Sequence, residues 1–142
     1  ACDLAVVADD CKFGLPELKR GNFPVLALAM MQKALPKKRV FEMAYLSELV
    51  DAETMYRWNM VNKIVPKDQV LDTALEWART ISSRSLLTAG MGREAYNKME
   101  GMSLVDSLEY CKNVLTCMLS THDAQEVDYA LKENRAPVLK GY

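Results

Sequence analysis

The chain has 142 residues, of which 50% are hydrophobic and 26% charged, with a formal net charge of −1 at pH 7. This mixture is typical of one packed globular unit and excludes a disordered tail, while the balanced charge excludes the basic surface of a nucleic-acid-binding protein. The apolar runs are far shorter than the roughly 18–20 residues that cross a bilayer, so we expect no membrane partner.

The first expected element is a short strand. In the segment Asp3–Ala8, apolar residues stand at both odd and even positions, and some of them are β-branched. This pattern is typical of a strand buried on both faces in a parallel or spiral sheet. The next segment, from Gly14 to Pro24, is dense in glycine, proline and asparagine. This composition excludes a regular helix or a central strand. We therefore expect a loop that is ordered by packing or by function.

Between Val25 and Pro66 the pattern is mainly helical. Pro36 separates two helices, because proline cannot continue a helix interior. Asp51 fits the N-cap of a third helix, and Asn59 fits the left-handed position after its end. The expected elements are helices over Val25–Leu35, over Lys37–Tyr45 and from Asp51 to Trp58, and then a strand over Val61–Val65.

The remainder of the chain is expected to be helical. Ser103 with Asp106, and Asp123 with Glu126, have the spacing of N-caps with an acidic partner three positions later. The expected helices cover residues 70–81, 86–99, 103–119 and a last stretch that begins at 123 and ends before 137. The third of these carries an apolar stripe of Leu104, Leu108, Cys111, Leu115 and Met118 or Leu119.

The change from a mixed pattern up to Pro66 to a helical pattern after it predicts two domains, 1–66 and 67–142. The first of them poses a problem, because one further strand cannot cover a strand that is buried on both faces. Unpaired backbone groups in such a strand would cost about 1–3 kcal/mol each. The missing sheet must come from another chain or from residues upstream of Ala1, so the chain has the character of the second half of a larger fold.

Several motifs, taken in order, resemble the crotonase (enoyl-CoA hydratase/isomerase) superfamily. The opening A-C-D and its apolar strand are followed by F-G-L-P-E at 13–17, with Gly21 and Pro24 at the family's spacing. D-A-E at 51–53 and M-V-N-K-I-V-P at 60–66 are similar to a second family segment. D-x-x-E at 123–126 and E-x-R-x-P-x-x-K-G at 133–141 are similar to the last one. The resemblance runs in register from Ala1 to Gly141.

The resemblance implies an α/β fold of which this chain is the C-terminal part. Residues 1–66 would complete a spiral ββα core, and residues 67–142 would form a helical region that builds a homo-trimer or a dimer of trimers. The chain itself would be mostly α-helical. Family members are about twice as long, and the two amide groups of their oxyanion hole lie upstream of A-C-D. In hydratases a first catalytic glutamate also lies upstream.

Glu17 is the candidate catalytic residue. In the family the matching glutamate moves a proton at the α- or β-carbon of an acyl-CoA, while the oxyanion hole stabilises the thioester enolate. The neighbours of Glu17 alone favour a solvated loop residue beside Lys19 and Arg20, and the case for catalysis comes from the family resemblance.

The resemblance also implies that Pro16, Pro24 and Val25 contact the substrate. The family often has a glycine-rich turn after the second proline, whereas this chain has V-L-A-L at 25–28. In hydratases the first of those glycines offers an amide near the attacking water. Val25 keeps the amide and adds a β-branched side chain, which alters the acyl pocket. Met30 and Met31 are expected either to line that pocket or to pack in the helix core.

Two basic segments are candidates for contacts with coenzyme A. The cluster K-K-R at 37–39 could hold a phosphate or form a solvated face. Near the C-terminus, Asn134 stands where the family has a lysine, although Arg135 and Lys140 remain, and this weakens the case for a phosphate contact there.

No metal or cofactor is expected. The four cysteines lack C-x-x-C spacing, so we expect free thiols, and the single histidine, His122, is expected at the surface or in an interface. The cysteines are Cys2, Cys11, Cys111 and Cys117.

The function expected from the resemblance is acyl-CoA thioester chemistry, with hydration of a 2-enoyl-CoA first and double-bond isomerisation second. A non-catalytic helical oligomerisation or interaction module is the alternative of another class, because the oxyanion donors are not in the chain. The thioester would be the substrate, and the missing N-terminal half of the fold would be a partner. The expected location is the cytoplasm or an organelle matrix.

Overall fold

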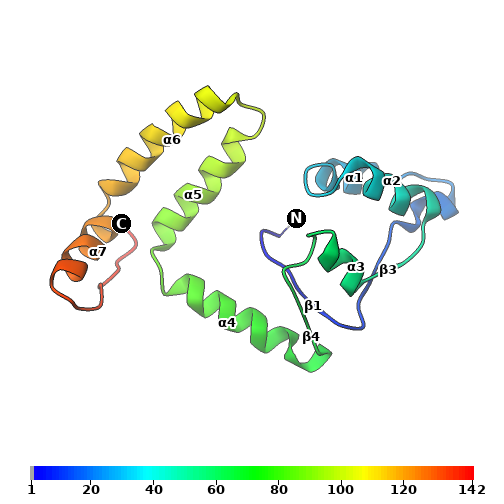
Figure 1. Cartoon of the computed structure of the whole chain (residues 1–142), viewed down its shortest axis with the longest axis horizontal. Helices are drawn as coiled ribbons and strands as arrows, with labels where there is room; N and C mark the ends of the chain where they lie inside the picture. The colour runs from blue at the N-terminus through cyan, green and yellow to red at the C-terminus, as the bar shows by residue number, and fades with distance from the viewer. Residues whose placement is uncertain (1) are drawn as a thin grey trace. The chain divides into compact units, whose positions relative to one another are not determined.

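The computed structural model describes residues 2–142, which form two compact units (Figure 1). The first ends at Glu76 and the second runs from Trp77 to Tyr142, so the division falls inside α4 (Val70–Ser82). The sequence placed the boundary earlier, near Pro66. The difference arises because the short 3-10 helix η2 (Lys67–Gln69) still packs against the first strand.

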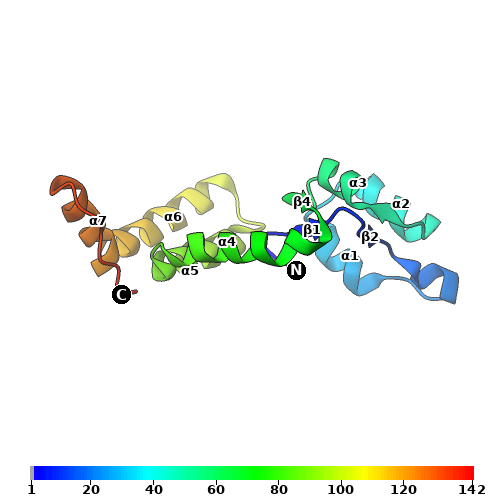
Figure 2. The same ribbon diagram turned by 90° about the horizontal axis from the view of Figure 1, so that it is seen from below.

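The first unit contains two small strand pairs, the first of which is labelled in Figure 2. β1 (Val6–Ala8) lies parallel to β4 (Lys63–Val65), and β2 (Lys12–Phe13) lies antiparallel to β3 (Val50–Asp51). Both strands expected from the sequence are confirmed, and each is shorter than expected. The first strand is not buried on both faces: only its last residue is buried, since β4 is its only partner among the described residues.

Besides η2 and the start of α4, this unit contains three α-helices and a 3-10 helix. They are η1 (Pro16–Arg20), α1 (Val25–Met31), α2 (Lys37–Leu46) and α3 (Ala52–Arg57). Side chains from α2, α3 and the segments around them form the core: Leu15, Leu35, Val40, Met43, Ala44, Met55 and Val61. The loop at 14–24 contains neither an α-helix nor a central strand, as expected.

The helix expected over Val25–Leu35 is wrong in its length. α1 ends at Met31, and the amides of Ala34 and Leu35 both donate to the Met31 carbonyl, at 3.0 and 2.9 Å, in a closing turn. Pro36 keeps the helix from including Leu35, because the residue before a proline avoids helical angles. Leu35 therefore leaves the helix and enters the core.

The expected caps of α3 are confirmed. The Asp51 carboxylate accepts the Thr54 amide at 2.8 Å, and Asn59 has a φ of 62°, in the left-handed region.

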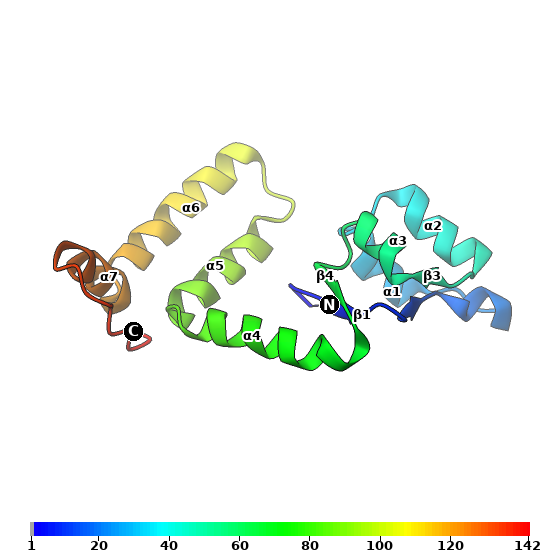
Figure 3. The same ribbon diagram turned by 60° about the horizontal axis from the view of Figure 1, so that its bottom comes forward.

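The second unit consists of helices, which Figure 3 shows in sequence. α5 (Leu86–Met99) packs against α6 (Leu104–Leu119), and α6 leads into α7 (His122–Lys132). Ser103 caps α6 as expected, accepting the Asp106 amide at 3.2 Å. The leucines of the apolar stripe stay outside this unit's core: Leu104, Leu108, Leu115 and Leu119 are 54–75% exposed.

The N-cap expected for α7 is wrong. Thr121, not Asp123, caps this helix, and its hydroxyl accepts the Ala124 amide at 3.3 Å. Asp123 lies in the first turn and is fully buried, so its carboxylate is directed to partners distant in sequence. No helix among residues 2–142 is both long enough and apolar enough to cross a membrane.

Candidate functional site

A tight turn presents Glu17. Pro16 starts η1, where its missing N–H is no loss, and Gly21 ends it with a φ of 72°. The Gly21 amide donates to the Leu18 carbonyl and the Asn22 amide to the Glu17 carbonyl, both at 3.1 Å. The backbone on either side of the carboxylate is therefore fixed.

The turn is anchored on the core of the first unit. Leu15, directly before η1, is buried in the core cluster, and η1 packs against α2. On the other side, a Cβ at Gly14 would lie 2.8 Å from the Leu49 side chain, so the chain passes too closely there for a larger residue without a shift. These two contacts give Glu17 a rigid base.

The Glu17 side chain is half-buried. Its Oε2 atom is shielded from solvent and has no hydrogen-bond partner among residues 2–142. A desolvated acceptor without a donor costs about 1–3 kcal/mol, and folded proteins rarely leave one unless it has a task. The geometry therefore differs from that of a fully solvated loop glutamate.

The other three candidate residues lie before and after this turn. Pro16 is exposed on η1, whereas Pro24 is buried and caps α1 with φ −78° and ψ 51°. These angles form an inverse γ-turn, in which the Val25 amide donates to the Phe23 carbonyl at 2.8 Å. The Val25 side chain is 64% exposed. The amide that the resemblance placed near an attacking water is thus already engaged within the chain.

An open, mostly apolar groove of about 550 Å³ lies between α1 and α2. Its lining residues are Val25, Leu28, Ala29, Gln32, Lys37, Val40 and Phe41. Neither Met30 nor Met31 lines this groove: Met30 is exposed, and Met31 packs against the core. No sequence motif predicts this groove, because its two walls come from different helices.

The basic cluster at 37–39 does not act as one patch. Arg39 pairs with Glu42 at 2.7 Å and lies 4.8 Å from the centroid of the Trp58 ring. Lys37 instead has its ammonium 5.8 Å from the centroid of Phe41. Arg39 is therefore committed to structure, while the Lys37 charge lies beside the groove.

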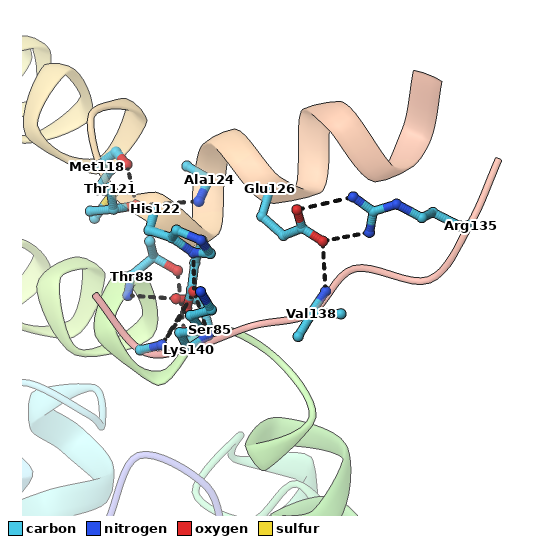
Figure 4. A network of polar contacts seen from close by, with 12 residues as sticks. Ser85, Thr88, Met118, Thr121, His122, Ala124, Glu126, Arg135, Val138 and Lys140 are labelled. Carbon is cyan, nitrogen blue, oxygen red and sulfur yellow. Dashed lines mark hydrogen bonds and ion pairs between the residues drawn. The ribbon is translucent and has the colours of Figure 1, made fainter. Parts of the chain in front are cut away.

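A second polar cluster lies in the helical unit, at the start of α7 (Figure 4). The buried Asp123 carboxylate accepts the amides of Lys140, at 2.7 Å, and Gly141, at 3.0 Å. These amides, with the Ser85 hydroxyl, lower the pKa of Asp123 to about 2, with the Lys140 amide contributing most. His122 is half-buried, with Nδ1 3.6 Å from the same carboxylate. These contacts hold the C-terminal segment, at Lys140 and Gly141, against the start of α7.

An ion pair extends this fastening along α7 (Figure 4). Glu126 accepts two N–H groups of the Arg135 guanidinium, at 2.5 and 3.1 Å, and the Val138 amide at 2.8 Å. Arg135 first, and then this amide, lower the pKa of Glu126 to about 2. Asn134 has a φ of 53° in the turn that brings Arg135 back. The D-x-x-E motif was visible in the sequence, but its role was missed: Asp123 and Glu126 together form a clamp that holds the C-terminal segment against α7.

No group of three or more histidine, cysteine, aspartate or glutamate side chains in the described part of the chain could hold a metal ion.

Comparison with known proteins gives a consistent family. The family model described as enoyl-CoA hydratase/isomerase matches residues 1–142. A probable enoyl-CoA hydratase from Mycobacterium bovis is 33% identical over 137 residues, covering 96% of this chain and 53% of that protein. A carnitinyl-CoA dehydratase from Citrobacter koseri is 32% identical over 146 residues, covering 99% of this chain and 56% of that protein. The chain thus spans about half the length of the curated relatives it matches.

Solved structures agree. An enoyl-CoA hydratase from Mycobacterium tuberculosis superposes with a TM-score of 0.91 at 26% identity, covering 99% of this chain and 56% of that one. An enoyl-CoA hydratase from Mycobacterium marinum gives 0.90 at 28% identity, with the same shares of the two chains. These likenesses confirm the expected fold class, the C-terminal part of a crotonase fold with mostly helical content.

Proposed function

The chain belongs to the enoyl-CoA hydratase/isomerase family, and from this we propose that it works on acyl-CoA thioesters through an enolate, as a hydratase of 2-enoyl-CoA. The unpartnered, shielded Oε2 of Glu17 carries the proposal. A carboxylate held on a rigid turn and kept from bulk water can exchange a proton with a bound reactant without first giving up another partner.

In this reaction a water oxygen bonds to the β-carbon, an O–H bond of the water and the π bond between the α- and β-carbons break, and the α-carbon gains a proton. Glu17 would carry one of these protons. The developing charge on the thioester oxygen needs two hydrogen-bond donors, which we assign to the N-terminal half of the fold. The reaction uses no cofactor, since the coenzyme A thioester is itself the substrate.

We further propose that this chain is the C-terminal half of such an enzyme and that the enzyme assembles as a homo-trimer or a dimer of trimers. The exposed leucines of α6 support an assembly, because burying them would remove a long apolar stripe from water. The cytoplasm or an organelle matrix remains the expected location.

Double-bond isomerisation is the second candidate, and one contact favours it. The Val25 amide donates to the Phe23 carbonyl at 2.8 Å, so it is not free to hold an attacking water. Isomerisation needs only the removal and return of a proton, which a single carboxylate at position 17 can perform.

The test compares Glu17→Gln with wild type in the protein expressed from its full reading frame. We expect turnover of 2-enoyl-CoA to fall by about 10²–10⁴-fold, while acyl-CoA binding stays within a few-fold, because glutamine keeps the shape and loses the proton carrier. Glu48→Gln, at an exposed glutamate outside the turn, is the matched control.

The substrates separate the alternatives. Addition of water to a 2-enoyl-CoA supports the hydratase, and conversion of a 3-enoyl-CoA into the 2-enoyl isomer without hydration supports the isomerase. Full activity in Glu17→Gln would refute the role of this residue. A wild-type protein that forms oligomers but turns over neither thioester would be the non-catalytic module.

A further inference from the structure

The groove between α1 and α2 is built from one face of each helix. Val25, Leu28 and Ala29 lie at helical positions i, i+3 and i+4, and Gln32 follows one turn later. From α2, the lining residues are Lys37, Val40 and Phe41, with the same i, i+3, i+4 spacing.

The two ends of the groove differ. Val25 stands at one end, in the segment that follows the Glu17 turn, and Gln32 and Lys37 stand at the other, where the two helices are joined. Gln32 lies seven positions after Val25, and a rise of about 1.5 Å per residue makes the groove about 10 Å long. This length suits an extended chain of roughly eight carbon atoms.

The far end carries a positive charge. The Lys37 ammonium lies 5.8 Å from the centroid of Phe41, a residue of the groove wall, so the charge is held beside the groove by the face of that ring. Lys37 forms no ion pair among residues 2–142, and the nearest carboxylate along the helix, Glu42, is engaged by Arg39. The positive charge therefore remains available to a ligand.

We propose that this groove selects acyl chains that end in a carboxylate, with Lys37 binding the terminal anion. This inference rests on the proposed function, since it assigns the acyl chain of that reaction to a groove that begins at Val25, in the segment after the Glu17 turn. The apolar walls contact the methylene groups, and the ammonium receives the charge that a plain fatty acyl chain lacks. A terminal methyl group would leave Lys37 without a partner and gain only the apolar contacts.

The experiment uses two 2-enoyl-CoA thioesters of equal carbon number, one ending in a carboxylate and one in a methyl group. We measure kcat/KM for both in the protein from the full reading frame, and dissociation constants for both in the Glu17→Gln variant with and without Lys37→Met. Wild type should prefer the carboxylate-ended thioester. Lys37→Met should reduce the preference ratio about tenfold, as expected for the loss of one charge-assisted contact of roughly 1.4 kcal/mol.

Lys38→Met is the matched control, because Lys38 is the next residue on the same helix and does not line the groove. Its preference ratio should stay at the wild-type value, and Lys37→Arg should retain most of the preference. A wild-type preference for the methyl-ended thioester, or an unchanged ratio in Lys37→Met, would overturn the inference.

The experiment distinguishes a failure of the proposed reaction from a failure of the groove assignment. If no variant turns over either thioester but the dissociation constants show the Lys37-dependent preference, the proposed reaction fails and the groove assignment stands. If turnover occurs without that preference, the reaction stands and the groove assignment fails. Absence of binding by either thioester contradicts the groove assignment as well.

Discussion

The carboxylate of Asp123 accepts the backbone N–H of Lys140 at 2.7 Å, although the two residues are 17 positions apart. In return, the Asp123 amide donates to the carbonyl of Tyr142 at 3.2 Å. One buried residue at the start of α7 thus satisfies backbone groups at the end of the chain and holds that segment against the helical unit.

Stability should fall in acid because of this clamp. The folded pKa of Asp123, about 2, lies below its usual 3.8, and that of Glu126, also about 2, lies below 4.5. The unfolded chain therefore binds more protons between about pH 4.5 and pH 2. The stability contributed by both carboxylates is complete above this window and is lost as the pH falls through it.

The free energy of unfolding, measured by chemical denaturation from pH 2 to 6, should show this slope. Asp123→Asn should reduce the slope, since position 123 no longer titrates. Asp128→Asn, at an exposed residue of the same helix, should leave it in place. An identical acid slope in Asp123→Asn and wild type would contradict the clamp.

Thr121 should matter as a helix cap. Its hydroxyl accepts the Ala124 amide at 3.3 Å and donates to the Met118 carbonyl at 2.7 Å. Thr121→Ala removes both bonds, and we expect a loss of about 1 kcal/mol in the free energy of unfolding. Thr121→Ser keeps the hydroxyl and should remain close to wild type. Equal stability of the two variants would show that Thr121 is not the cap.

Substitution of two glycines by alanine should change the stability of the protein in opposite directions. Gly90 lies inside α5 with nothing within 4 Å of an added Cβ, so Gly90→Ala should raise the free energy of unfolding by about 0.5–1 kcal/mol. Gly21 has a φ of 72°, which alanine adopts poorly, and Gly21→Ala should lower it by about 1 kcal/mol. Thermal denaturation of both variants measures the two effects. A shift of the two melting temperatures in the same direction would contradict the helical angles of Gly90 or the left-handed angles of Gly21.

The sequence by itself determined the features whose causes are local. α5 begins and ends at the expected residues, Asp51 caps α3, and Asn59 is left-handed, because caps and periodicity depend on neighbours within about four positions. Glu17 was singled out by a motif, and its catalytic role stays a prediction. The incomplete sheet was also foreseeable, since a doubly apolar strand had only one possible partner.

Only the tertiary structure decided the features that join distant segments. It directed Asp123 to Lys140 instead of to the helix end, and it brought Val25 of α1 and Lys37 of α2 to the lining of one groove. It also left the leucines of α6 exposed, where a periodic pattern alone cannot tell a core from an interface. The physical reason is the same throughout: a residue's type fixes which bonds it can make, whereas packing fixes which partner comes within reach.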